Sequence, residues 1–113
     1  REINTLYNLL LSDNDNVRVT SELKDCKSIH WMTSIELIEC SFDSREKFMQ
    51  KLKKNLIDSR PVFSPMSSLP MFNSRIKNSV ANRIGSSAIN LPSGHNLKNS
   101  QIEFICETIS KIL

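Results

Sequence analysis

Three prolines within a short apolar stretch set the strongest limit on how this chain can fold. From Ser59 to Ser74, the prolines Pro61, Pro65 and Pro70 alternate with Val, Phe, Met and Leu side chains. A proline fixes its own φ and pushes the preceding residue toward extended geometry, so no regular helix fits this stretch. We therefore predict an ordered, apolar, non-helical loop, and loops of such length inside a compact domain are more often functional than neutral.

Two amphipathic helices are predicted before this loop. The first ends near Leu11, because the Asn and Asp residues that follow favour turns. The second starts at Asp43, which with Glu46 forms a capping-box arrangement. The apolar residues with helical spacing are Ile3, Leu6, Tyr7 and Leu10 in the first helix and Phe48, Met49, Leu52 and Leu56 in the second.

Two more helices are predicted after the loop. A short one runs from about Asn78 to Ile84 and ends at Gly85, which tolerates positive φ. The last one opens near Asn99 or Ser100, with Glu103 placed to complete a capping box. Its predicted buried residues are Ile102, Ile105, Cys106, Ile109 and Leu113.

Alternating polar and apolar residues predict the strands. One short strand carries Val17, Val19, Ser21 and Leu23, and a longer one runs from about Ile29 to Cys40. On the longer strand Trp31, Thr33, Ile35 and Leu37 share the face expected to be buried. Residues 88–91 form a further short extended segment. The element order predicts an α+β domain, with a small, mainly antiparallel sheet covered by helices.

Composition bounds the class of protein. At 113 residues one domain is expected. A formal charge of +3, from 15 basic against 12 acidic residues, gives no dominant field for a polyanion, so nucleic acid is not implied. The basic run at residues 51–54 is expected to be a solvated helix face. An RNA-binding sheet is disfavoured because no strand has the basic, glycine-containing aromatic pattern.

Cysteine usage and targeting signals indicate a location. Cys26, Cys40 and Cys106 form no CxxC pair and no cluster with zinc-ligand spacing, so a reduced compartment is the simplest interpretation. There is no signal-peptide pattern and no apolar stretch of membrane-spanning length, so we expect a cytoplasmic protein without a membrane partner. Because Arg1 already stands inside a helical pattern, we also expect the chain to be part of a larger protein.

Four short motifs, taken in order, carry a family resemblance. They are RPVFSPM at residues 60–66, LPMF at 69–72, NLPS at 90–93 and QIEFIC at 101–106; His30-Trp31-Met32 and Arg45 fit the same pattern. Together they resemble the C-terminal small domain of DegT-type aminotransferases, closest to the GDP-perosamine synthase branch. The resemblance covers nearly the whole chain.

This resemblance implies a homodimeric, pyridoxal-phosphate (PLP) dependent parent enzyme. Such an enzyme transfers an amino group, usually from glutamate, to a keto-sugar carried on a nucleotide. The lysine that holds the cofactor belongs to a large domain, and no lysine here sits where the family pattern would place it. The resemblance therefore implies PLP in the parent and none bound to this chain, which is expected to be inactive alone.

Four residues are candidates for substrate binding: Arg60, Ser67, Met66 and Trp31. Arg60 could grip a phosphate or carboxylate in bidentate geometry, although a surface ion pair is the alternative. Ser67 stands where many relatives carry a histidine facing the sugar, so this departure weakens any direct transfer of that role. Met66 could line a substrate wall, and Trp31 is more often a core residue at such a position.

Other residues of these types are weaker candidates. His30 heads the central strand, and His95 follows Gly94 in a turn without a partner cluster. Met71 and Phe72 are expected to pack the loop onto its own sheet. The competing hypothesis for the whole chain is a free-standing α+β module that binds a ligand or partner through the stiff loop.

Overall fold

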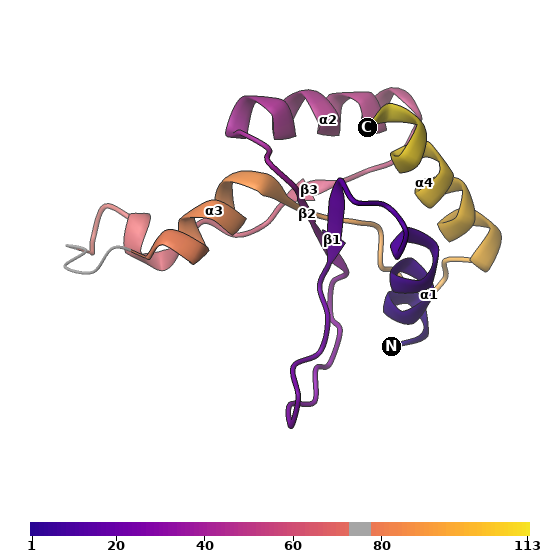
Figure 1. Ribbon diagram of the computed structural model, residues 1–113, viewed down its shortest axis with the longest axis horizontal. Coiled ribbons are helices and arrows are strands. Elements are labelled where there is room, and N and C mark those ends of the chain that lie inside the picture. The colour runs from indigo at the N-terminus through magenta and orange to yellow at the C-terminus, as the bar shows by residue number, and fades with distance from the viewer. Residues whose placement is uncertain (73–77) are drawn as a thin grey trace.

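The computed structural model describes residues 1–72 and 78–113, and their elements follow the predicted order (Figure 1). The helices are α1 (Glu2–Leu11), α2 (Phe42–Lys54), α3 (Ser79–Ser87) and α4 (Asn99–Ile112), with a 3₁₀ turn η1 (Met66–Ser68). The strands are β1 (Val17–Val19), β2 (Ser34–Leu37), β3 (Arg60–Pro61) and β4 (Ala88–Asn90). The predicted α+β class is confirmed. Asn73 and Ser74, the end of the predicted loop, lie outside the described residues.

The sheet has the strand order β1-β2-β4-β3, and all neighbouring strands are antiparallel. The strand predicted to be central, β2, lies between β1 and β4. Its Ile35 stands opposite Ile89 of β4, and both side chains are fully buried. β3 is an edge strand, where a proline is tolerated because its missing N–H breaks no ladder.

The two faces of the sheet are covered differently. In Figure 1, α1 and α4 lie on the right of the sheet, α2 lies above it, and α3 extends to the left. The Ile35 face joins one core with α1, α2 and α4, whose buried side chains include Tyr7, Leu52 and Ile109. α3 meets the opposite face, where its Arg83 pairs with Glu36 of β2.

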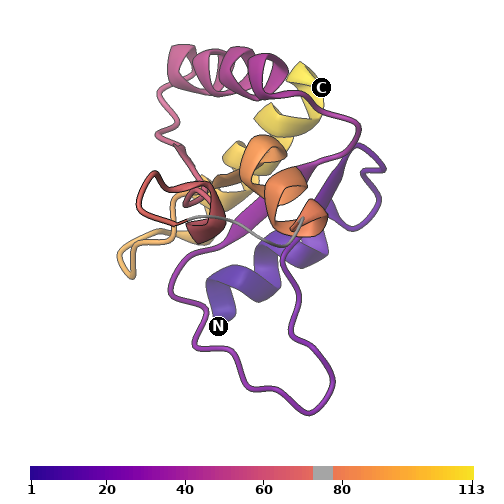
Figure 2. The ribbon, with the colours of Figure 1, turned by 90° about the vertical axis from the view of Figure 1, so that its left-hand side faces the viewer.

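Two segments project from this body. Residues 20–33, which connect β1 and β2 and are called here the hairpin loop, form the long extension at the bottom of Figure 1. Residues 62–72, called here the proline loop, run beside α3. Figure 2 shows α3 in front of the sheet, with the hairpin loop projecting below it.

Trp31 corrects the sequence-based expectation for the central strand. β2 begins only at Ser34, and His30 has a φ of 46°, so the alternation that would bury Trp31 with Ile35 is broken. Trp31 is 69% exposed, whereas Thr33, Ile35 and Leu37 are buried as predicted. The first strand is also shorter than predicted.

Helix ends differ from the predictions as well. α2 is capped by Ser41, whose Oγ accepts from the Ser44 N–H at 3.2 Å. The prediction that Asp43 caps this helix was therefore wrong. Leu56 lies beyond the helix in a left-handed conformation and is 96% exposed, and Ile57 takes the buried place. The backbone N–H of Leu56 therefore helps to close the end of the helix, and its side chain does not extend the apolar stripe.

The last two helices show the same kind of shift. α3 continues through Gly85 to Ser87, so Gly85 does not end it. α4 starts at Asn99, where the Gln101 side-chain oxygen accepts from the Lys98 N–H at 2.9 Å in place of the predicted Ser100 box. The predicted α4 core residues are buried, except that Leu113 is half exposed.

Candidate functional site

The proline loop is ordered by its own short hydrogen bonds. The Ser68 N–H and hydroxyl both donate to the Pro65 carbonyl, at 2.9 and 2.7 Å, and the Leu69 N–H donates to Met66 at 3.1 Å. These bonds close η1 within the loop. As predicted, residues 59–72 contain no regular α-helix; this described part of the predicted stretch combines β3, extended backbone and one 3₁₀ turn.

Trp31 contacts the proline loop through an aromatic stack. Its ring centroid lies 6.3 Å from that of Phe63, with an angle of 25° between the ring planes. Phe63 is 73% exposed, so the pair forms an apolar surface rather than part of the core. Phe63 was not among the predicted substrate-binding residues, although it is the aromatic residue of the RPVFSPM motif.

Arg60 lies on the edge strand that precedes the proline loop. It belongs to β3 and pairs in register with Asn90 of β4. Its Nε and Nη2 each donate to Asp58 Oδ2 at 3.3 Å, and both side chains are 77% exposed. An ion pair with this exposure contributes little to stability, so the guanidinium can exchange this partner at low cost.

Met66 and Ser67 lie apart from Arg60. They belong to η1, which Figure 1 shows beside α3 at the far end of the proline loop from β3. Met66 is exposed and Ser67 is half-buried. The candidates thus do not form one cluster: Met66 and Ser67 lie on η1 of the proline loop, Arg60 lies on β3 before the loop, and Trp31 of the hairpin loop contacts the proline loop through Phe63.

The weaker candidates are placed as follows. Met71 and Phe72 are exposed, so the expectation that they pack the loop onto its sheet was wrong. His30 is largely enclosed, and its Nε2 lies 3.3 Å from Glu22 Oε2. His95 is exposed in the turn after Gly94. In residues 1–72 and 78–113, His, Cys, Asp and Glu side chains do not gather in any group of three that could hold a metal ion.

The hairpin loop is held by a charged cluster. Glu22 accepts from Arg1 at 2.6 Å and from the Ser28 N–H at 3.1 Å, in addition to its contact with His30. Desolvation pushes the pKa of Glu22 up, but hydrogen bonds from Arg1, His30 and Ser28 outweigh it and lower the pKa below its ordinary value.

A buried carboxylate on the outer sheet face was not anticipated. The Glu36 side chain is only 11% exposed; it pairs with Arg83 of α3 and, at 3.5 Å, with Arg18 of β1. Buried charges of this kind are normally paired. The sequence signal was a glutamate inside an apolar strand, but nothing in the sequence identified its two partners.

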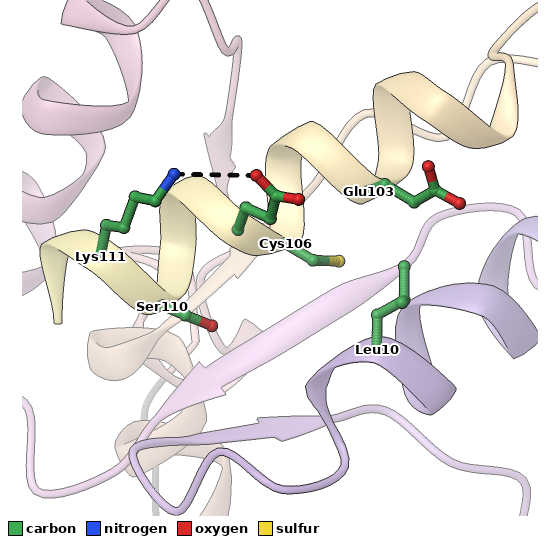
Figure 3. Close-up of a pocket in the computed structure, with 6 residues that line it drawn as sticks. Leu10, Glu103, Cys106, Ser110 and Lys111 are labelled. Carbon is green, nitrogen blue, oxygen red and sulfur yellow. Dashed lines mark ion pairs between the residues drawn. The ribbon is translucent and has the colours of Figure 1, made fainter.

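A hollow lies between α1 and α4, on the other side of the sheet from α3. Figure 3 shows the groove between α1 and α4, where Leu10 faces Cys106, Glu103 and Ser110, and Lys111 pairs with Glu107. Burial raises the pKa of the Cys106 thiol to about 11. A thiol with such a pKa is a poor nucleophile at neutral pH, so this groove offers no activated group.

The lysines of the described residues lie in open surroundings. The eight described lysines are all exposed, at positions 24, 27, 47, 51, 53, 54, 98 and 111, and Lys77 lies outside the described part. A lysine that holds PLP must be neutral at working pH, which needs desolvation or a neighbouring cation. The first turn of α2 also carries Asp43, an anion that would repel a phosphate.

Comparison with known proteins identifies the family. Residues 1–110 match the DegT/DnrJ/EryC1/StrS aminotransferase family. The GDP-perosamine synthase of Escherichia coli is 37% identical over 112 residues, which is 98% of this chain and 30% of that protein. The chain thus spans less than a third of that curated relative.

Solved structures show the same fold. PseC of Helicobacter pylori, an aminotransferase involved in pseudoaminic acid biosynthesis, matches 97% of this chain and 30% of its own, with a TM-score of 0.82 and 21% identity. A Streptococcus pneumoniae protein in its PLP form matches 99% of this chain and 31% of its own, with a TM-score of 0.80 and 18% identity. The sequence match over residues 1–110 and the 37% identical relative together show that the chain belongs to the DegT/DnrJ/EryC1/StrS aminotransferase family.

Proposed function

We propose that this chain is the C-terminal small domain of a PLP-dependent aminotransferase. The parent enzyme would transfer an amino group, with glutamate as donor, to a nucleotide-linked keto-sugar. One observation carries the proposal: the 37% identity to a GDP-perosamine synthase extends over 98% of this chain but only 30% of that relative. We further propose that the parent is a cytoplasmic homodimer. In the described residues no helix has the length and apolar character needed to cross a bilayer.

In this proposal the cofactor is held outside the chain, by a large domain of the parent. PLP supplies the electron sink of amino transfer when it is bound. The exposed lysines described above support this division, because none has the enclosed environment that its neutral form requires. The contribution of this chain is then to bind and orient the substrate from one side of the cleft between the domains, where small-molecule sites commonly lie.

The exposed apolar side chains of the proline loop support the proposal that another part of the parent covers this surface. The proline loop leaves Phe63, Met66 and Met71 largely exposed, whereas the partly exposed Leu10 lies on α1, on the other side of the molecule, and does not belong to this surface. Contiguous exposed apolar surface marks interaction sites in soluble proteins. We propose that the loop side closes the cleft and that the large domain covers part of this surface.

Arg60 is the residue that we propose to contact an anionic group of the substrate or cofactor. It is exposed and precedes Phe63 of the aromatic stack by three residues, and its present partner, Asp58, is a weakly held surface carboxylate. A planar guanidinium binds phosphate or carboxylate through two parallel hydrogen bonds, which a lysine cannot reproduce.

Steady-state kinetics of the full-length enzyme test this assignment. We expect Arg60→Lys to lower kcat/KM for the nucleotide-sugar by about tenfold or more, since losing one bidentate contact costs at least about 1.4 kcal/mol. Asp58→Asn is the matched control, because it removes the ion pair and leaves the Arg60 guanidinium intact. Its kcat/KM should stay near that of the wild type. Unchanged parameters in Arg60→Ala would remove Arg60 from the site.

A labelling experiment tests the division between domains. The 113-residue chain would be incubated with PLP and reduced with borohydride, and the modified peptides would be mapped. We expect only scattered, substoichiometric modification of exposed lysines. Stoichiometric labelling of one lysine, together with amino transfer from glutamate to a keto-sugar nucleotide, would contradict the proposal.

A further inference from the structure

The proline loop meets α3 at a position that has no room for a side chain. A Cβ atom added to Gly85 would lie 2.8 Å from Cδ and 3.1 Å from Cγ of the Pro65 ring. Real Cβ atoms are not found at 2.8 Å, and a proline ring cannot rotate away as a flexible side chain can. The loop therefore packs directly on the backbone of α3 at this point.

The same glycine is held from the other side by a buried arginine. Arg45 of α2, whose side chain is 4% exposed, donates from Nη1 to the Gly85 carbonyl at 2.7 Å. This carbonyl is among the last four of α3, which have no partner within the helix. Arg45 is itself fixed by Glu46 at 2.9 Å and by the ring of Phe42, whose centroid lies 4.6 Å from its Cζ.

α3 is also fixed to the centre of the sheet. Its Arg83, two residues before Gly85, pairs with the nearly buried Glu36 of β2. Arg45 and Arg83 thus hold α3 to α2 and to β2, while Pro65 rests on Gly85. Gly85 thus joins the proline loop to the body of the domain, in addition to the Val62 N–H, which donates to the Ala88 carbonyl at 3.3 Å where the loop begins.

We infer that Gly85 is a positioning residue that fixes the proline loop relative to the sheet, and with it the stack of Phe63 on Trp31. The functional consequence rests on the function proposed above: in the parent enzyme Gly85 would set the geometry of the substrate-facing surface without contacting substrate. The inference about position itself concerns this chain alone. The two can therefore be tested separately.

NMR of the 113-residue chain gives the structural test. The sequence has one tryptophan, so the Trp31 indole N–H signal is unambiguous, and its NOEs to the Phe63 ring report the stack. Gly85→Ala should weaken or abolish these NOEs, although alanine is the better helix former. Gly94→Ala is the matched control: a Cβ there would meet the Asn96 side-chain oxygen, which can rotate away, so the NOEs should persist.

Removing the proline ring tests the mechanism and covers a Gly85→Ala variant that fails to fold. If the clash with the ring is the cause, Pro65→Ala makes room for the new methyl group, and the double variant should recover folding and the Trp31–Phe63 NOEs. Unchanged NOEs in Gly85→Ala would overturn the inference. So would a defect of Gly85→Ala that persists undiminished in the Pro65→Ala background, since contacting residues should be coupled.

Kinetics of the full-length enzyme separate this inference from the proposed function. We expect Gly85→Ala to raise KM for the nucleotide-sugar several-fold and Gly85→Ala/Pro65→Ala to reverse part of that rise. A displaced stack without any kinetic change would leave Gly85 as a positioning residue and contradict the substrate-facing role of the loop. A kinetic change with an intact stack would contradict the positioning role.

Discussion

The body of the domain and its two projecting loops use the same apolar residue types for opposite purposes. In the body, Ile35 and Ile89 are fully buried against helices. In the projections, Trp31 and Phe63 stack on each other and remain mostly exposed. Apolar character in the sequence therefore does not separate core from surface. What separates them is whether the backbone places the residue on the inner face, which it does mostly within regular elements and, for Ile57 and Leu91, just beyond the end of one.

The largest contrast is expected between two isoleucines. Ile89→Ala should reduce the free energy of unfolding by about 2–5 kcal/mol, because it leaves a cavity in the core. Ile29→Ala makes the same change in the hairpin loop, where the side chain is 87% exposed, and should stay within about 0.5 kcal/mol of wild type. Chemical denaturation measures both. Similar losses would show that the hairpin loop is packed in solution.

Two arginines sharpen the comparison at a smaller scale. Arg45→Ala should cost about 1–3 kcal/mol of unfolding free energy, because it leaves the Gly85 carbonyl without its partner. Arg60→Ala should cost about 0–1 kcal/mol, as expected for an exposed ion pair. In the full-length enzyme the order should be the reverse: Arg60→Ala should lower kcat/KM more than Arg45→Ala does. A destabilised Arg60→Ala chain would contradict this division.

The smallest effect is expected in the hairpin loop on acidification. Because the pKa of Glu22 is lowered in the folded chain, its contribution is complete above the ordinary value of 4.5 and is lost as the pH falls below it. The protection of the Ser28 N–H, which is its exchange rate relative to the intrinsic rate at the same pH, should fall in that range because this N–H donates to Glu22, while β2 stays protected. In Glu22→Gln the protection of Ser28 should not change with pH in that range, and exposed Glu39→Gln serves as the control.

The spacing of apolar residues correctly predicted many of the buried positions in the helices and strands. The α4 core positions Ile102, Ile105 and Ile109 and the alternation of Thr33, Ile35 and Leu37 were predicted and are buried. Element order and sheet class were predicted for the same reason. Helix ends were less predictable, because several nearby groups can cap a terminus: Ser41 caps α2 in place of Asp43, and α2 ends at Lys54, two residues before the left-handed Leu56.

The candidate site was predictable only in part. The prolines revealed the loop, but the exposure of Trp31 depends on a positive φ at His30, which sequence patterns do not indicate. Gly85 was interpreted as a helix end because glycine usually serves there, whereas it provides room for Pro65. Contacts such as Arg45 with Gly85 join distant segments and have no local sequence signal.

The strand order has a consequence for how the chain reaches this structure. β4 is synthesised after β2 and β3 but lies between them in the sheet. Neither β2 nor β3 can therefore pair with β4 until residues 88–90 have left the ribosome. The hydroxyl of Tyr7 on α1 donates to the Pro92 carbonyl at 3.0 Å, so docking of the first helix awaits nearly the same segment. Closure over such sequence separations is entropically costly and slow. During translation, β2 and β3 therefore cannot become part of one sheet until this short late segment is available.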